Sequence, residues 1–226
     1  MIVQHNITSM NANRQLGIVG NNLAKSTEKL SSGYRINRAA DDAAGLAISE
    51  KMRAQVRGLN RASDNAQDGI SLIQTAEGAM DQQHAILQRA RELVVQASNS
   101  GVLDKDSDDD FQKIQDELNE IGKEFERINT DTEFNKKKLL DGTYRSQYFQ
   151  VGANKEQGIS VTIAKTVWAK PTITGGNGKT NSAVIDTIDT MIKGVTTERS
   201  KLGAVQNRLE YTVKVDDNTA ENHAGC

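Results

Sequence analysis

An apolar stripe between Ser71 and Asn99 constrains the fold more than any other feature of this sequence. Its residues recur in alternating steps of three and four, with one polar slot: Ile73, Ala76, Met80, Gln83, Leu87, Ala90, Val94 and Ala97. A second row lies beside it with a seven-residue period: Leu72, Ala79, Ile86 and Leu93. Side chains at these spacings share one face of an α-helix and leave water by packing on another helix. The stepping continues backwards to Ile48, so the sequence predicts a helical rod of about fifty residues, ~75 Å long.

The composition fits narrow helix–helix seams better than a round core. Of the 226 residues, 36% are hydrophobic and only 4% are aromatic, and the single proline is Pro171. The formal net charge of −2 gives no reason to expect nucleic acid or an anionic membrane as a partner, and no apolar run is long enough to span a bilayer. The sequence therefore predicts a mainly α protein, an elongated antiparallel helical bundle or coiled coil with a small β-hairpin region.

The cysteine content and the amino terminus bear on the compartment. The single cysteine, Cys226, cannot form an intrachain disulfide or a cysteine-based metal site. The first ten residues, MIVQHNITSM, lack the basic start and apolar middle of a secretory signal peptide. We therefore expect a cytosolic protein, or one that leaves the cell by a route that reads no such signal.

An amino-terminal helix is predicted over Thr8–Leu30, with Gly33 as its stop. Its stripe has the same three–four spacing: Ala12, Leu16, Val19, Leu23 and Leu30. We see no partner for this stripe in the next forty residues, and an isolated helix of this length is marginal in water. We expect the segment to be poorly ordered in a dilute monomer until another molecule supplies the other half of the seam. After it, Asp41 or Asp42 is expected to cap the rod.

Two further helices are predicted to pack on the rod. The first follows Ser107 as its N-cap and folds back antiparallel, because the connection is short; its stripe is Phe111, Ile114, Leu118, Ile121, Phe125 and Ile128. The second runs from Asn181 to Val213, and the polar tail after it is expected to fray. Between these helices, TYRSQYFQVG and the alternating ISVTIAKTVWA predict one or two β-hairpins.

No motif predicts a catalytic residue, a cofactor site or a metal site. The GKT stretch at 178–180 ends like a phosphate-binding loop, but Ile173 stands where that loop needs glycine. The acidic turn at 104–108 resembles the start of a calcium loop, yet Asp109 and Gln115 stand where the loop needs glycine and glutamate. The histidines are scattered and pair with no nucleophile in the sequence. We therefore predict that the protein is not an enzyme.

One pair of residues on the rod suits a protein interface. Arg89 and Leu93 are one helical turn apart and place a guanidinium beside a leucine that we expect to be partly exposed. Arginine beside an apolar side chain is a frequent interface anchor. The alternative for Arg89 is a solvated face with helix-spaced charge pairs, since Arg91 and Glu92 lie beside it.

Several long segments resemble bacterial flagellins, in the same order along the chain. They are NITSMNANRQL, LSSGYRINRAADDAAGLAISEKMRAQVRGL, QRARELVVQASN, TEFNKKKLLDG and SKLGAVQNRLEYTV. The resemblance covers Met1–Gly142 and about Glu198–Asn222, and residues 143–181 fall where flagellins vary most. It implies a structural subunit that polymerises with its neighbours into the bacterial flagellar filament for motility. It also implies secretion of the unfolded chain through the flagellar export apparatus.

The resemblance also implies a domain organisation. Residues 1–40 would form the filament-core helix and its linker, and residues 41–142 the rod and second helix of an outer α-helical domain. Residues 143–181 would form a short variable β-hairpin region, and residues 182–226 the returning helix with a polar tail. Flagellins continue after the DNTAEN-like segment with a terminal apolar helix, whereas this sequence turns to NHAGC. We therefore expect this polypeptide by itself not to extend ordinary filaments.

Sensing of the free monomer by Toll-like receptor 5 is a further implication of the resemblance. The positions that match the family's receptor-contact motif are Arg89 and Leu93 on the rod and Glu117 on the second helix. We expect these three residues to lie side by side on one exposed face, because the two helices are antiparallel.

Two other protein classes share parts of the pattern. A hook–filament junction protein is the nearer alternative, and the continuous QRARELVVQASN match counts against it. A generic coiled-coil adaptor is the other, and SSGYRINRAADDAAGLAISEKMR counts against that. A flagellin with a protease insert would need an HExxH motif, which the middle region lacks.

Overall fold

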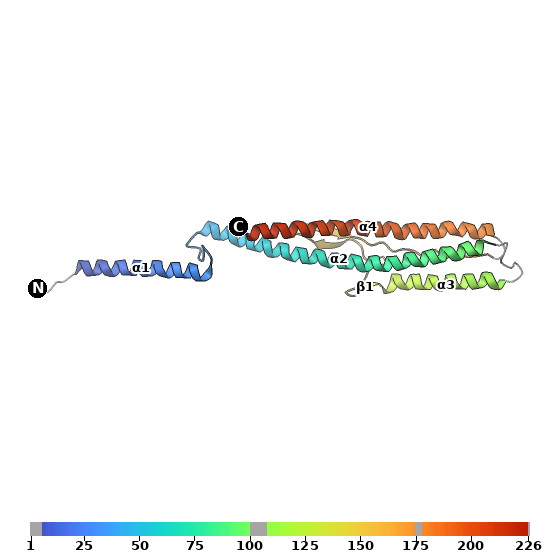
Figure 1. The fold of residues 1–226 in the computed structure, drawn as a ribbon, viewed down its shortest axis with the longest axis horizontal. Coiled ribbons are helices and arrows are strands. Elements are labelled where there is room, and N and C mark those ends of the chain that lie inside the picture. The colour runs from blue at the N-terminus through green and yellow to red at the C-terminus, as the bar shows by residue number, and fades with distance from the viewer. Residues whose placement is uncertain (1–5, 100–107, 175–177, 226) are drawn as a thin grey trace. The chain divides into compact units, whose positions relative to one another are not determined.

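The computed structural model describes residues 6–99, 108–174 and 178–225. The helices in these ranges are α1 (Ile7–Ser32), α2 (Ala43–Ser98), α3 (Asp108–Asp131) and α4 (Gly178–Ala224) (Figure 1). Two antiparallel strand pairs accompany them: β1 (Glu133–Phe134) with β2 (Lys137–Lys138), and β3 (Gln147–Gln150) with β4 (Gly158–Val161). The predicted fold class, mainly α with a small β-hairpin region, is confirmed. The chain forms two compact units, residues 1–55 with 223–226 and residues 56–222.

Helix α1 is the main element of the first unit, and it covers the predicted Thr8–Leu30. The Asn6 side chain caps its start by accepting a hydrogen bond from the Ser9 amide at 3.1 Å. Gly33 ends it in the left-handed conformation, φ 74°, where its amide donates to the Lys29 carbonyl. Glycine adopts this conformation without steric cost, which is why it stops the helix at this position. No residue of α1 is buried.

The segment between α1 and α2 carries its own polar contacts. Arg38 donates from Nε and Nη2 to the two carboxylate oxygens of Glu28, at 3.0 and 3.1 Å. Asp42 accepts a hydrogen bond from the Gly45 amide at 2.9 Å and thereby caps α2. Of the two capping residues that the sequence allowed, the structure selects Asp42.

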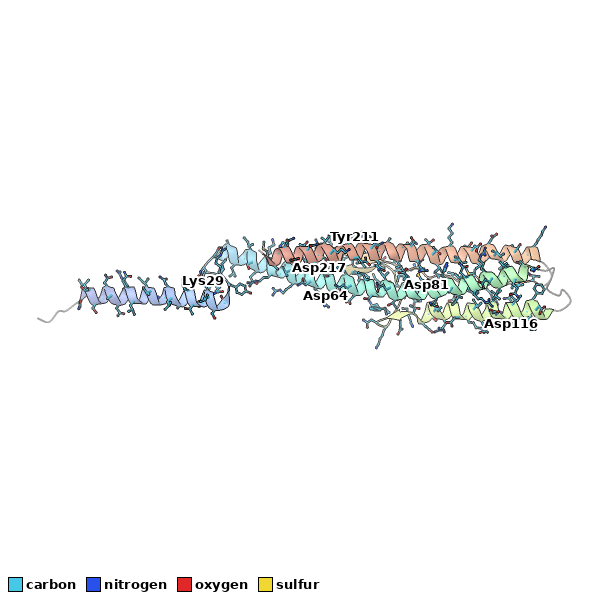
Figure 2. The ribbon with its side chains drawn as sticks, viewed as in Figure 1. Lys29, Asp64, Asp81, Asp116, Tyr211 and Asp217 are labelled. Carbon is cyan, nitrogen blue, oxygen red and sulfur yellow. The ribbon has the colours of Figure 1, made fainter. Side chains whose placement is uncertain are left out.

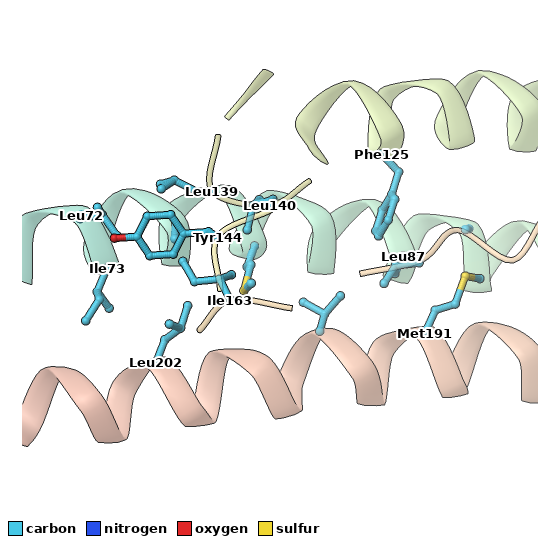
Figure 3. Packing of buried hydrophobic residues seen from close by; sticks show 14 of the residues in the cluster. Leu72, Ile73, Leu87, Phe125, Leu139, Leu140, Tyr144, Ile163, Met191 and Leu202 are labelled. Carbon is cyan, nitrogen blue, oxygen red and sulfur yellow. The ribbon is translucent and has the colours of Figure 1, made fainter. Parts of the chain in front are cut away.

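Helix α2 is the centre of the second unit, with α3 and α4 on either side of it (Figure 1). All eight residues of its predicted main stripe are fully buried, Gln83 included. In Figure 3, Leu202 of α4 and Phe125 of α3 extend toward α2, and both belong to the same buried cluster as Ile73 and Leu87. Buried positions on α4 repeat mostly at seven residues and face this seam: Ile188, Val195, Leu202 and Leu209. The predicted rod is confirmed.

Helix α3 has the predicted stripe and direction. Its residues Phe111, Ile114, Leu118 and Phe125 are buried, and Ile121 and Ile128 are half-buried. Contacts between α2 and α3 pair Arg89 with Glu117 and Gln83 with Asn129. Residue numbers fall on one helix as they rise on the other, so the helices are antiparallel, as predicted. The predicted N-cap Ser107 and most of the acidic turn at 104–108 lie outside the described residues.

The strand pairs follow α3. In the longer hairpin Tyr148 pairs with Ser160 and Phe149 with Ile159. The predicted alternation is confirmed, since Ile159, Val161 and Ile163 are all buried. The shorter hairpin, β1–β2, was not predicted. It turns through two residues of positive φ, Asn135 at 48° and Lys136 at 63°, a geometry typical of two-residue hairpin loops. Its strands are too short to show any alternation in the sequence.

The carboxy-terminal tail corrects one prediction. The helix does not end at Val213 with a frayed tail; α4 continues to Ala224. Asp216 and Ala220 are each only 7% exposed and continue the buried spacing beyond Leu209. The Ser63 hydroxyl of α2 also donates to the Asp217 carboxylate at 2.9 Å. The sequence of the tail is polar because the two residues that pack against α2 are an aspartate and an alanine. Helix α2 covers them all the same.

Asp216 lowers the stability of this seam at neutral pH. Its Oδ2 atom is buried and has no hydrogen-bond partner among the described residues. Burial, with a smaller contribution from the charge of Asp217, raises the pKa of the Asp216 carboxyl above its usual value. Because the folded pKa lies above the unfolded one, stability rises as the pH falls through the folded pKa and is lower above it.

Asp216→Asn is therefore expected to raise the free energy of unfolding at pH 7 by about 1 kcal/mol. The gain should shrink on acidification, because the raised pKa makes the wild-type carboxyl take up a proton earlier in the folded protein than in the unfolded one. Urea unfolding at pH 7 and pH 4.5 measures both values, and the exposed Asp186→Asn on the same helix is the control. A gain of equal size at both pH values, or a loss at pH 7, would contradict the burial of an unpaired carboxylate.

Candidate interaction surfaces

The first candidate surface is formed by α2 and α3 and contains Arg89 and Glu117. The Arg89 guanidinium donates from Nε and Nη2 to Oε1 of Glu117, at 3.0 and 2.8 Å. A longer contact of 3.4 Å joins Arg89 to Glu92 on its own helix. The side chains of Arg89 and Glu117 are 55% and 43% exposed, so the pair is open to a partner. The hydrogen bonds and charge of Glu117 raise the pKa of Arg89.

Leu93 does not share this exposure, and here the structure corrects the sequence analysis. The side chain predicted to be partly exposed is only 2% exposed. The reason is that α2 has a helix on two sides, so its buried arc is wider than one stripe. In the flanking row Leu72 is also buried, at 5% exposure, whereas Ala79 and Ile86 are half-buried. Leu93 thus supports the surface from beneath and does not lie on it.

Arg91 shows that neighbouring charges on α2 have different roles. Its Nε donates to Oδ1 of Asp189 on α4 at 2.8 Å, whereas Arg89 reaches α3. Residues two apart point to nearly opposite sides of a helix, so the two arginines serve opposite seams. Asp81 of α2 likewise pairs with Arg199 of α4 at 2.9 Å. Figure 2 labels Asp81 on α2 and Asp116 on α3.

The second candidate surface is the apolar stripe of α1. Within the unit formed by residues 1–55 and 223–226 its large side chains stay exposed, with exposed fractions of 75% for Leu16, 63% for Val19, 66% for Leu23 and 86% for Leu30. Ala12 is exposed too. Single exposed leucines are common, but a helix-long apolar stripe favours association with another helix.

Sequence reasoning missed a buried polar cluster between α2, α3 and the segment after β4. Gln83 donates from Nε2 to Asn129 Oδ1 at 2.8 Å, and Thr166 donates from Oγ1 to Gln83 Oε1 at 2.9 Å. Asn129 in turn donates from Nδ2 to the Thr166 carbonyl at 3.0 Å. Gln83 and Asn129 are fully buried. The signal in the sequence was Gln83, the one polar residue in the main stripe, but its partners are distant along the chain.

Among residues 6–99, 108–174 and 178–225, no three His, Cys, Asp or Glu side chains are grouped so as to hold a metal ion. No helix in those ranges is long and apolar enough to cross a membrane.

Comparison with known families identifies the chain. A family model described as the bacterial flagellin N-terminal helical region matches residues 3–145, and one described as the C-terminal helical region matches residues 185–223. The chain belongs to the bacterial flagellin family. Its family is one of structural proteins, not of enzymes.

Individual relatives agree with this assignment. A flagellin of Halalkalibacterium halodurans is 52% identical over 230 residues, which span 98% of this chain and 82% of that protein. A flagellin of Bacillus subtilis is 46% identical over 257 residues, with 98% and 84% covered. A 31.3 kDa flagellar filament core protein of Treponema maltophilum is 44% identical, with 98% and 83% covered. The crystal structure of Bacillus cereus flagellin superposes with a TM-score of 0.57 at 25% identity, covering 67% of this chain and 88% of that one.

Proposed function

We propose that this protein is a structural subunit of the bacterial flagellar filament, and that it serves motility after export through the flagellar secretion apparatus. The observation that carries this proposal is the uncovered apolar stripe of α1. A protein that keeps a whole helix face exposed gains stability when copies of that helix, or helices of neighbouring subunits, cover it.

The size of the effect supports assembly through α1. Burying a leucine or valine side chain contributes roughly 1.5–3 kcal/mol, and the stripe holds Leu16, Val19, Leu23 and Leu30. Part of this gain is offset by the order that the helix must acquire. In a polymer each subunit buries such a stripe, so the contribution repeats along the filament.

Leu16→Asp and Leu23→Asp, each placed in the chromosomal gene of the bacterium that makes this protein, are expected to abolish filaments and swimming. A carboxylate in the assembled seam must be desolvated without a partner. Asn21→Asp is the matched control, because it adds the same charge on the opposite face of α1. Filament length by electron microscopy and spreading in soft agar measure the result. Normal filaments in both leucine variants would place the assembly surface elsewhere.

We also propose that Toll-like receptor 5 senses the free monomer through the surface that contains Arg89 and Glu117. The support is their proximity: the guanidinium offers planar donors beside a carboxylate from another helix, and both are exposed. Leu93 belongs to this proposal as the buried support of α2 beneath them. Its substitution should act on the fold before it acts on the contact.

Arg89→Ala and Glu117→Ala are each expected to weaken receptor binding about tenfold or more, the effect of an interface hot spot. Arg91→Ala is the matched control, because it removes a similar ion pair on the opposite seam. Affinity measured by surface plasmon resonance, beside circular dichroism of each variant, separates contact from folding. If Arg91→Ala weakened binding as much as Arg89→Ala, the loss would reflect the bundle and not this surface.

A further inference from the structure

Residues 164–174 form an extended segment without helix or strand, which we call the strap. It joins β4 to α4 and crosses the second unit among α2, α3 and α4. Its backbone is held by side chains of these helices, in place of a neighbouring strand. The Thr166 carbonyl accepts from Asn129 at 3.0 Å, and the Ala169 amide contacts the Met191 sulfur at 3.1 Å.

Two side-chain amides hold the distal half of the strap as a strand partner would. Gln115 accepts from the Ile173 amide at 2.8 Å and donates to the Pro171 carbonyl at 3.2 Å. Asn181 accepts from the Thr174 amide at 2.9 Å and donates to the carbonyl of the same residue at 3.1 Å. Paired donor and acceptor contacts of this kind bind an extended backbone whatever its side chains are.

Asn181 is itself fixed in place. It is fully buried and donates to the Ala97 carbonyl near the end of α2 at 3.0 Å. Gln115 is held on its own helix by Asn119 at 3.3 Å. Both side-chain amides are therefore also held by groups outside the strap, Gln115 by Asn119 and Asn181 by the Ala97 carbonyl.

The groove also accepts particular side chains of the strap. Thr166 and Pro171 are buried, and Trp168 and Ile173 are half-buried. The Trp168 ring lies 5.6 Å from the Phe125 ring. It fits because Gly122 has no side chain: a Cβ there would lie 2.5 Å from the indole Nε1. The residues between them point outward and are exposed, Val167 at 66%.

We propose that α2, α3 and α4 form a binding groove for an extended peptide, which residues 164–174 of the same chain occupy. The ligand class is an extended segment with a threonine, an aromatic residue and a proline at the spacing of Thr166, Trp168 and Pro171. The same segment supplied in trans binds this groove when the attached strap is weakened. In the wild-type chain the attached strap competes at the high effective concentration of a tethered ligand.

The test uses the full chain with Trp168→Ala and Ile173→Asn. These substitutions weaken the packing of the strap in its groove and leave the side-chain amides of Gln115 and Asn181 unchanged. Trp168 is the sole tryptophan, so this variant contains none. A synthetic peptide of residues 162–174 then carries the only tryptophan in the mixture, and its emission reports binding. We expect the tryptophan emission of the peptide to shift to shorter wavelength, in a saturable way, when the variant is added. Binding to the wild-type chain, which has its own tryptophan, is measured with a labelled peptide and should be at least tenfold weaker.

Two controls make the outcome decisive. Adding Gln115→Leu to the strap-weakened variant should reduce peptide affinity at least tenfold, while Gln112→Leu, one turn earlier on the exposed side of α3, should not. If circular dichroism shows that the double variant loses its helices, the single variant Trp168→Ala replaces it in the peptide-binding measurement. Absence of saturation at millimolar peptide with a helical variant overturns the proposal. Equal binding to wild-type and weakened chains overturns it as well.

Discussion

Leu118→Asp is expected to unfold the unit formed by residues 56–222 at neutral pH. Leu118 is 1% exposed in the middle of the α3 stripe, where the helix packs on α2. The substitution removes a buried leucine, which alone costs about 2–5 kcal/mol. It also places a carboxylate in the apolar seam, and burial of an unpaired charge adds several kcal/mol by rough estimate. A loss of this size equals much of the stability of an ordinary domain.

Thermal unfolding followed by circular dichroism measures this effect. Asp116→Asn is the control on the same helix, because Asp116 is exposed and accepts a 2.8 Å hydrogen bond from Gln112 within α3. We expect that control to shift the free energy of unfolding by less than about 0.5 kcal/mol. Similar melting temperatures for the two variants would show that α3 packs in another register.

Asn129→Leu is expected to cost about 2–4 kcal/mol, because it breaks a closed polar cluster without removing its other members. The Gln83 amide loses its acceptor, and the Thr166 carbonyl loses its donor, in a place that water does not reach. A buried polar group left unsatisfied costs about 1–3 kcal/mol, more than the net worth of the hydrogen bond itself. The exposed Asn207→Leu on α4 controls for the change of residue type.

The matched test of this cluster is to replace all of it. Gln83→Met with Asn129→Leu and Thr166→Val should recover most of the stability that Asn129→Leu loses, since no orphaned group remains. Urea unfolding of the single and the triple variant gives the comparison. A triple variant less stable than Asn129→Leu would contradict this account. It would mean that the hydrogen bonds themselves stabilise the seam, and that the cost of an unsatisfied polar group is not the main effect.

The sequence by itself determined the helices apart from the end of α4, the stop of α1 at Gly33 and the long hairpin, and it left Asp41 and Asp42 as the two candidates for the cap of α2. Steps of three and four place side chains on one helical face whatever the partner is, and an apolar face must be covered. That local rule located α2, the stripe of α3 and the buried alternation of Ile159, Val161 and Ile163. Gly33 and Asp42 acted through their own backbone and side-chain geometry, which also needs no distant residue. The resemblance carried by long matching segments pointed to the flagellin family.

Only the tertiary structure decided which faces were covered, and by what. Leu93 is buried because α2 has two neighbours, a fact that one stripe cannot reveal. The tail of α4 is ordered because α2 lies opposite Asp216, although its composition is polar. Arg89 meets Glu117, and Asn129 meets Thr166, across tens of residues of sequence. Such contacts depend on where separate elements meet in space. Hydrophobic periodicity identifies the face that each element buries, but it does not identify the element that covers this face.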